Sequence, residues 1–237
     1  MPLLVRTWNV FHGNAAPPER RSFLEQMVRL ATADEPDVVC LQEVPVWALD
    51  RLDAWSGMAA VGAVAARPRL VDARLGGALT ALHHGLLRSA VAGQANAVLV
   101  SRRLRVLERR TFRVSRRGEG ERRVCQVVRL GDAGLAANFH VTSRHAEPQL
   151  LRAAAFADAL ALPAEPVILC GDANLRPGAG DAYEELASWG FSQPAQGIDQ
   201  ILVRAVDASP PETWPEERRR VGGRLLSDHA PVELRVG

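Results

Sequence analysis

A carboxylate and an amide follow one apolar stretch of this chain almost directly. In "PVILCGDANLRPG" (166–178) the apolar run stops at Gly171, and Asp172 and Asn174 come next with one small residue between them. Asp and Asn are common turn residues, because both tolerate left-handed backbone conformations and bond to their own backbone. The pair is chemically meaningful only if other parts of the chain supply partners for it.

Five more apolar runs begin or end in residues that can do chemistry. These residues are Asn9 in "TWNV", Glu43 in "VVCLQEV", His140 in "ANFHV", Asp199 in "GIDQILV", and Asp228 with His229 in "LLSDHAPVEL". Each alone has a structural explanation as a turn residue, a cap or a buried group bonded to backbone. If the strand ends converge, however, unpaired carboxylates share one pocket, which is costly unless a cation lies there. Ligands of layered α/β sheets bind at strand ends, so we expect one site there.

The elements that must position these residues alternate between strands and helices. Strand-like runs are expected at 3–10, 37–44, 96–102, 104–114, 123–130, 134–141, 166–171, 198–203 and 230–236, and helices at 17–36, 45–54, 147–162 and 181–189. The runs 104–114 and 123–130 flank the turn "SRRGEGE" and predict a β-hairpin. Because hairpins occur among interleaved strands and helices, the sheets should be mixed. A Pro-, Gly- and charge-rich loop is expected at 205–224.

Length and composition fit one globular domain, 1–237. The 237 residues can bury a sizeable core, and 47% hydrophobic with 24% charged residues exclude a disordered chain. The net charge of +2 indicates no partner by itself, and no protein partner is evident. All 29 basic residues are arginine, which excludes a mechanism that needs a catalytic lysine.

Cysteine usage and hydropathy bear on the compartment. Cys40, Cys125 and Cys170 have no paired spacing, and two of them lie inside apolar runs. The first residues do not resemble a signal peptide, and no stretch approaches the roughly 18–20 apolar residues of a membrane span. We therefore expect a cytoplasmic protein without a membrane span.

Seven motifs in order resemble those of the endonuclease/exonuclease/phosphatase superfamily, which has the deoxyribonuclease I-like fold. They are "TWNV", "LQEV", "NAVLVSR", "NFHV", "GDAN", "GIDQILV" and "SDHAPV", and the resemblance extends from Thr7 to Leu234. It implies a four-layered α/β sandwich, with two mixed β-sheets packed face to face and helices outside. It also implies hydrolysis of phosphoesters with a divalent metal, usually Mg²⁺, with Mn²⁺ as an alternative.

The resemblance assigns metal ligands at three positions. Glu43 would bind the ion directly, and Asn9 and Asp228 would bind it directly or through water. Oxygen ligands suit Mg²⁺, which is a hard cation and keeps several waters.

It also assigns catalytic roles. His140 and His229 would face the phosphate as charged donors, and Asp199 would orient His229 and favour its protonated form. Asp172 would orient or deprotonate the attacking water, and Asn174 would donate to the phosphoryl oxygens.

Substrate binding has two further sets of candidates. Eleven of the 29 arginines lie between Arg102 and Arg129 against three acidic residues, and Arg113, Arg116, Arg117 and Arg123 among them are candidate phosphate contacts. The alternative is that these arginines form a solvated face of the hairpin, since basic patches occur both on solvated surfaces and at contacts with a phosphate backbone. Asn96, in "NAVLVSR", either supports the phosphate or an active-site side chain or is a buried residue bonded to backbone.

We expect a Mg²⁺-dependent phosphodiesterase or nuclease, with nucleic acid among its candidate substrates. Abasic-site endonucleases of the family carry Lys after "QE" and Tyr before "GD", whereas this chain has Val44 and places its one tyrosine at 183. One alternative is a phosphatase or a sphingomyelinase-like hydrolase of a small or lipid phosphate, favoured if the loop 205–224 closes a narrow pocket; Trp214 in this loop either stacks on a base or ring or packs under the loop. The other is a non-catalytic binding module. The remaining histidines are expected to serve loops or the surface: His12, His83, His84 and His145.

Overall fold

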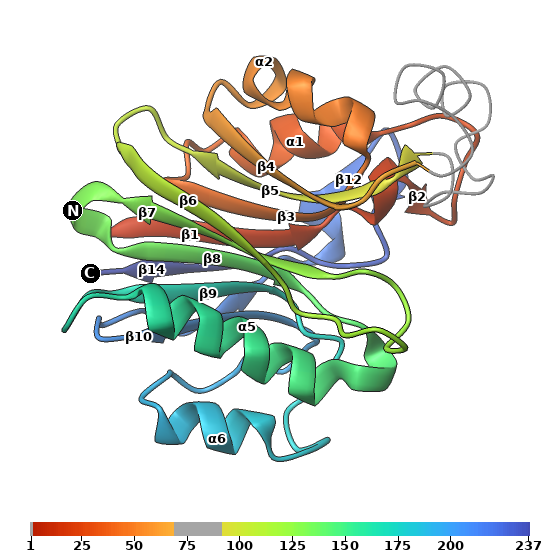
Figure 1. The fold of residues 1–237 in the computed structure, drawn as a ribbon. Coiled ribbons are helices and arrows are strands. Elements are labelled where there is room, and N and C mark those ends of the chain that lie inside the picture. Colours follow the sequence, from red (N-terminus) through yellow and green to blue (C-terminus); the bar gives the residue numbers. More distant parts are fainter. Residues whose placement is uncertain (1, 69–91) are drawn as a thin grey trace.

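Two β-sheets pack face to face, and helices cover their outer faces (Figure 1). The computed structural model describes residues 2–68 and 92–237, so His83 and His84 lie outside the described residues. The expected four-layered sandwich with mixed sheets is confirmed.

The first sheet has six strands. In spatial order they are β11 (Glu212–Thr213), β14 (Val232–Val236), β1 (Leu3–Asn9), β3 (Val38–Val44), β5 (Gln94–Val100) and β4 (Ala59–Ala66). Strands β1 and β3 are parallel, and the other neighbours are antiparallel. Strands β1, β3 and β5 are buried on both faces, which explains why their sequences are largely apolar, although β1 includes the buried Arg6.

The second sheet has five strands. In spatial order they are β10 (Asp199–Arg204), β9 (Val167–Asp172), β8 (Leu135–His140), β7 (Val124–Leu130) and β6 (Val106–Arg113). Only β8 and β9 are parallel, and β6 and β7 form the expected antiparallel hairpin. Strand β6 is an edge strand, and most of its residues are exposed.

A small third sheet connects the stretch 205–224 to the chain just after β1. Its strands are β12 (Arg220–Val221), β13 (Arg224–Leu226) and β2 (Ala15–Ala16). The stretch expected to be one loop therefore contains short strands and the 3₁₀ helix η5 (Glu216–Arg219).

The described residues form four α-helices. Helices α1 (Leu24–Thr32) and α2 (Leu52–Ser56) cover the first sheet, and α5 (Ala146–Leu160) and α6 (Ala182–Ser188) cover the second. The other 3₁₀ helices are η1 (Phe11–Gly13), η2 (Val46–Arg51), η3 (Gly131–Ala133) and η4 (Ser143–His145). Helix α1 begins later than expected, because residues 17–23 form a loop in which the Phe23 N–H donates to the carbonyl of Gly13.

The layer between the sheets is mainly apolar, although the buried amide of Gln42 on β3 donates to Asn138 on β8 across it, and it brings the strand ends together. Val, Leu, Ile and Ala side chains from both sheets fill it, together with Cys40 and Cys170. The three cysteines are buried and free. Among the described residues, no helix is both long and apolar enough to cross a membrane.

Candidate active site

The register of the second sheet places three ionisable residues in one row. His140 at the end of β8 pairs with Asp172 at the end of β9, and Asp172 pairs with Asp199 at the start of β10. Neighbouring strands lie about 4.8 Å apart, so their side chains share one small region. All three residues are buried.

Gly171 allows the backbone at Asp172 to approach β8. Its φ is +151°, and a Cβ added there would lie 1.9 Å from the carbonyl oxygen of Phe139. Only glycine fits this close approach. The glycine before Asp172 is thus a packing requirement of the β8–β9 pair.

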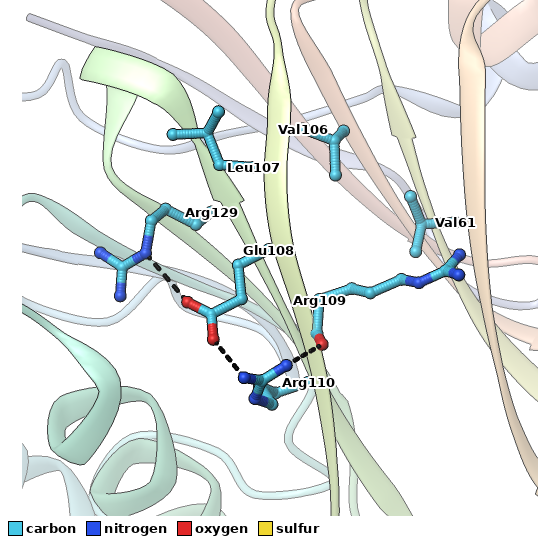
Figure 2. Close-up of a pocket in the computed structure, with 7 residues that line it drawn as sticks. All are labelled: Val61, Val106, Leu107, Glu108, Arg109, Arg110 and Arg129. Carbon is cyan, nitrogen blue, oxygen red and sulfur yellow. Dashed lines mark hydrogen bonds and ion pairs between the residues drawn. The ribbon is translucent and has the colours of Figure 1, made fainter.

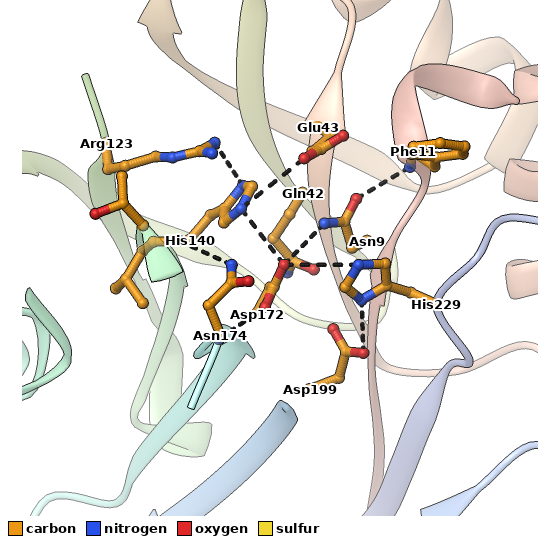
Figure 3. Close-up of polar contacts among 12 residues, drawn as sticks. Asn9, Phe11, Gln42, Glu43, Arg123, His140, Asp172, Asn174, Asp199 and His229 are labelled. Atoms are coloured by element: carbon orange, nitrogen blue, oxygen red, sulfur yellow. Dashed lines mark hydrogen bonds and ion pairs between the residues drawn. The ribbon is translucent and has the colours of Figure 1, made fainter. Parts of the chain in front are cut away.

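Asp172 is the centre of the cluster (Figure 3). Its Oδ2 accepts from Asn9 Nδ2 at 2.9 Å, and its Oδ1 accepts from the backbone N–H of Asn174 at 2.9 Å. The same Oδ2 lies 3.4 Å from His140 Nε2 and 3.9 Å from His229 Nε2. One carboxylate therefore faces two imidazoles and is held by residues of both sheets.

The electrostatic environment of Asp172 favours its neutral form. Burial and the negative charge of Asp199 raise the pKa of Asp172 to about 7, although His229 and the bond from Asn9 act in the opposite direction. A carboxyl group with this pKa can exchange a proton near neutral pH.

Asp199 and His229 form a buried pair. The Oδ2 of Asp199 lies 2.8 Å from His229 Nδ1. Burial lowers the pKa of His229, but the hydrogen bond and charge of Asp199 outweigh it and raise that pKa to about 9. His229 is therefore an imidazolium at neutral pH, with its Nε2–H directed toward Asp172.

Glu43 lies between two other histidines. Its carboxylate oxygens are 3.4 Å from His12 Nε2 and 3.9 Å from His140 Nε2. Burial raises the pKa of Glu43, and the charges of Arg123 and His229 oppose this effect. His12, which was expected to serve a loop, is buried beside the cluster. Its position three residues after Asn9 was the sequence feature that could have indicated this.

The environment of His140 makes it a neutral donor. Its Nδ1 lies 2.9 Å from a guanidinium nitrogen of Arg123, which can only donate. Nδ1 must therefore accept, and the ring proton is on Nε2, which faces Asp172. Burial and the charge of Arg123 lower the pKa of His140 well below its usual value. The expectation of a charged His140 is corrected accordingly.

Four residues around the cluster have left-handed backbone conformations. The φ values are +53° at His12, +57° at Glu43, +46° at Asn174 and +61° at Ser227. Such conformations cost free energy for residues other than glycine and persist where the surrounding structure over-determines them. Here they turn side chains toward the cluster at the ends of extended segments.

Some expected site residues lie elsewhere or have other partners. Asn96 is buried away from the cluster, and its amide donates to the carbonyls of Val124 and Asn138, so the expectation of a phosphate contact is corrected. Asn174 borders the cluster, but its amide donates to the carbonyl of Val141 at 2.9 Å. Asp228 is exposed beside His229.

A cavity of ≈ 470 Å³ opens over the cluster. It is lined by Glu43, Arg123, His140, Asp172, Asn174 and His229, by the hairpin residues Gly118, Glu119, Gly120 and Glu121, and by Thr142, Ser143, Arg144 and His145 after β8. Of the arginines expected to contact phosphate, Arg123 lines the cavity, whereas Arg113, Arg116 and Arg117 are exposed outside it. The lining residues 118–121 and 142–145 were not predicted from the sequence, because they lie in loops and no apolar run marks them.

The stretch 205–224 does not close this cavity. None of its residues lines the cavity, and Trp214 is buried against Trp8 at a ring distance of 6.4 Å. The guanidinium groups of Arg6 and Arg218 lie over the Trp214 ring at 4.4 and 3.7 Å. Trp214 therefore packs within the fold. The stretch 205–224 does not form the closed pocket that would have favoured a phosphatase.

The cluster's charges fit a divalent cation. Two buried carboxylates, Asp172 and Asp199, and the half-buried carboxylate of Glu43 face Arg123 and the imidazolium of His229. Asp199 Oδ1 is buried and has no hydrogen-bond partner among the described residues. Ligand atoms of Asp172, Asp199 and His229 lie within 4.8 Å of one another. A cation would offset the excess negative charge.

Comparison with known proteins agrees with this geometry. A family model described as "Endonuclease/Exonuclease/phosphatase family" matches residues 7–229. No curated protein matches the chain. A conserved protein of unknown function from Enterococcus faecalis V583 has a similar structure, with a TM-score of 0.72, 16% identity and 99% of each chain covered.

Two further solved structures belong to named proteins. TDP2 from Caenorhabditis elegans has a TM-score of 0.64 at 18% identity, covering 100% of this chain and 75% of that one. A mannosyl-6-phosphatase from Bacteroides thetaiotaomicron VPI-5482 has a TM-score of 0.64 at 16% identity, covering 99% of each chain. At these identities the likeness establishes the fold.

Proposed function

The chain belongs to the endonuclease/exonuclease/phosphatase family, whose chemistry is phosphoester hydrolysis, and from this premise we propose that it is a Mg²⁺-dependent phosphodiesterase acting on nucleic acid. The observation that carries the proposal is the position of Asp172. Its carboxylate, with a pKa of about 7, is fixed by Asn9 and faces the Nε2 atoms of His140 and His229 at the floor of an open cavity.

Enzymes of the family generally use divalent metals, and the oxygen donors at this site suit Mg²⁺, or Mn²⁺ in its place. Glu43 and Asn9 would hold the ion, with Asp228 acting through water. His229 is a poor ligand, because its Nδ1 is bonded to Asp199 and the ring is protonated. When bound, the ion would stabilise negative charge on the phosphoryl oxygens.

Asp172 would act as the general base. Water attacks phosphorus, its proton passes to the Asp172 carboxylate, and the bond from phosphorus to the leaving oxygen breaks. Asn9 and the backbone N–H of Asn174 fix the carboxylate, so it is already oriented when the water arrives. A pKa near the working pH suits a group that must both accept and release this proton.

The two histidines would serve different purposes. His140 donates from a neutral Nε2–H to the phosphoryl oxygens, because Arg123 occupies its Nδ1. His229, as an imidazolium held by Asp199, can stabilise the developing charge and supply a proton to the leaving oxygen.

A phosphatase or lipid-phosphate hydrolase remains the second candidate. The ≈ 470 Å³ cavity lies in the size range of small-molecule sites, which is the observation in its favour. Against it, the arginines next to the cavity suit a longer anion than a single phosphate group.

A substrate panel separates these activities. Single-stranded and duplex DNA, RNA, inositol phosphates and sphingomyelin are each incubated with the protein in Mg²⁺ and in excess chelator. We expect cleavage of nucleic acid in Mg²⁺, no cleavage in chelator, and full activity in the control variant Asp207→Asn, which changes an exposed carboxylate away from the cavity. Cleavage of inositol phosphates or sphingomyelin alone would establish the second candidate instead.

A further inference from the structure

The hairpin of β6 and β7 has many more arginines than its own carboxylates can pair. Between residues 102 and 129 there are eleven arginines and three glutamates. Glu108 pairs with Arg110 and Arg129, and Glu121 pairs with Arg123. Glu119 pairs with an arginine of α5, Arg152, outside this segment. All three carboxylates are thus engaged.

The other hairpin arginines divide into two groups. Arg102 donates to the carbonyl of Gly57, and Arg103 bonds to Asp37. Six arginine side chains have neither a hydrogen bond nor an ion pair within the described part of the chain: Arg105, Arg109, Arg113, Arg116, Arg117 and Arg122. All six are exposed.

These six arginines mark a path along the hairpin. Arg109 and Arg113 lie four residues apart on the edge strand β6, Arg105 lies just before this strand and the register shift between Val106 and Glu108, and the other three lie in the turn that follows. At about 3.3 Å per residue, the path from Arg105 to Arg113 is roughly 26 Å long. The turn then supplies residues 118–121 to the wall of the catalytic cavity, so the path leads to the active site.

Figure 2 shows the end of β6 that lies away from the active site. Glu108 bonds to Arg110 and Arg129, whereas Arg109 extends toward Val61 of the other sheet without a carboxylate partner. An open hollow of ≈ 760 Å³ lies here between the two sheet edges. A polyanion that lies along this edge would therefore meet several guanidinium groups that no carboxylate of the chain already pairs.

An exposed aromatic ring lies on the other face of β6 from Arg109 and Arg113, because successive strand side chains point to opposite faces. Phe112 on β6 is 40% exposed and stacks on Phe156 of α5 at a ring distance of 5.0 Å. A single strand has its phosphates and its bases on opposite sides, and any base can stack on an aromatic ring, so an edge with arginines on one face and Phe112 on the other suits it. The buried floor of the cavity also suits a single strand, whose backbone can enter, better than a duplex.

We propose that the edge of β6 and the turn 115–122 bind the backbone of single-stranded nucleic acid and guide it into the catalytic cavity. This inference rests on the proposed function and extends it by naming the strand state and the path. A membrane surface fits less well, since the turn "SRRGEGER" has no apolar side chain to insert.

The test measures binding separately from cleavage. A labelled 12-nucleotide oligo(dT) is titrated in chelator over a range of salt concentrations, using the wild-type chain and the variant Arg105→Gln/Arg109→Gln/Arg113→Gln. The control variant Arg29→Gln/Arg51→Gln/Arg235→Gln removes three exposed arginines from α1, η2 and β14 and changes the net charge equally.

We expect the β6 variant to bind on the order of a hundredfold more weakly at 0.1 M salt. Its log–log salt slope should be smaller by about 2, since each lost single-strand phosphate contact removes roughly 0.7. The control variant should retain the wild-type slope. Phe112→Leu should weaken binding severalfold without changing the slope, because stacking releases no counterions.

Equal slopes in the β6 variant and the control would overturn the inference, as would tighter binding of a duplex than of a single strand. Loss of binding to anionic phospholipid vesicles with unchanged oligo(dT) binding would assign the path to a membrane and would also overturn it. If oligo(dT) binding changes as expected but no phosphoester is cleaved, the binding path is supported and the proposed function is refuted. If cleavage occurs but binding does not depend on these arginines, the proposed function is supported and the binding path is refuted.

Discussion

Asp172 explains why a buried strand of this chain ends in Asp-Ala-Asn. Gly171 lets β9 approach β8, and the Ala173 N–H continues the ladder to the carbonyl of Ile198. Asn174 then adopts a positive φ, and its N–H and amide bond to Asp172 and Val141. The Asp-Ala-Asn segment is therefore both a turn and a part of the candidate site, because the turn residues hold the Asp172 carboxylate in place.

The pairing of Asp199 with His229 predicts non-additive effects of substitution. Asp199→Asn should lower the single-turnover rate less than His229→Ala, because the imidazole remains but loses orientation and charge stabilisation. In the double variant the loss should equal that of His229→Ala alone, since Asp199 acts through His229. Single-turnover rates of the four proteins form the cycle, with melting curves as the folding control. Full additivity would refute the pairing.

Glu43 should govern the metal requirement. Glu43→Gln keeps the size of the side chain but removes a half-buried carboxylate charge from the cavity, so the Mg²⁺ concentration for half-maximal rate should rise by tenfold or more. Metal titrations of the rate measure this, with Glu184→Gln on the exposed face of α6 as the matched control. An unchanged Mg²⁺ requirement in Glu43→Gln would remove this residue from the metal site.

At the scale of elements, the hairpin turn is fastened to α5 by Glu119. Its carboxylate accepts from the Arg116 N–H at 2.8 Å, from Gln149 at 3.2 Å and from Arg152. The bond from Arg116 lowers the pKa of Glu119 to about 2; burial opposes this effect, and Arg152 and Gln149 reinforce it. The cavity wall thus depends on an ionised side chain.

This linkage has a defined pH dependence. Because the folded-state pKa lies below the ordinary glutamate value of 4.5, Glu119 contributes stability that is fully present above about pH 4.5 and is lost as the pH falls toward 2. Glu119→Gln should therefore lower the free energy of unfolding at pH 7, and its difference from wild type should shrink below pH 4.5. Urea unfolding between pH 7 and pH 3 measures the difference. A difference that grows on acidification would contradict this account.

The stretch 205–224 supports the turn that carries His229. One guanidinium nitrogen of the buried Arg219 donates to the carbonyls of Leu226, Ser227 and His229 at 3.3, 2.9 and 3.2 Å. Arg219→Met should lower the single-turnover rate by up to about 10²-fold, since small misplacements of a catalytic group are costly. Arg218→Met is the matched control, because Arg218 bonds to Asp34 and Glu233 instead. It should lower the melting temperature without changing the rate, and equal rates for both variants would dismiss the role of Arg219.

Sequence reasoning succeeded where burial leaves a pattern. Strands β1, β3 and β5 are covered on both faces, so they are apolar runs whose ends are easy to locate, and their polar ends were recognised. Strand β4, "AAVGAVAA", is rich in Ala and Gly and was not recognised as a strand. The neutral state of His140 was not predictable, because it depends on Arg123, seventeen residues away in the sequence.

At the scale of the whole molecule, the site belongs to neither sheet alone. Asn9 and Glu43 come from the first sheet, whereas His140, Asp172 and Asp199 come from the second. The mainly apolar layer between the sheets therefore sets the distance between the proposed metal site and the proposed base. Substitutions in this layer should reduce activity before they unfold the protein, since they alter the relation of the two sheets.

The most direct test of the account is the single-turnover cleavage of a single-stranded oligonucleotide by wild type and Asp172→Asn. The substitution preserves the size of the side chain at a turn that Asn can also form, so fold and binding should be retained. We predict that cleavage by wild type needs Mg²⁺ and stops in chelator, and that Asp172→Asn in Mg²⁺ is slower by about 10²–10⁴-fold. A folded Asp172→Asn protein that binds the oligonucleotide and cleaves it at the wild-type rate would contradict the account.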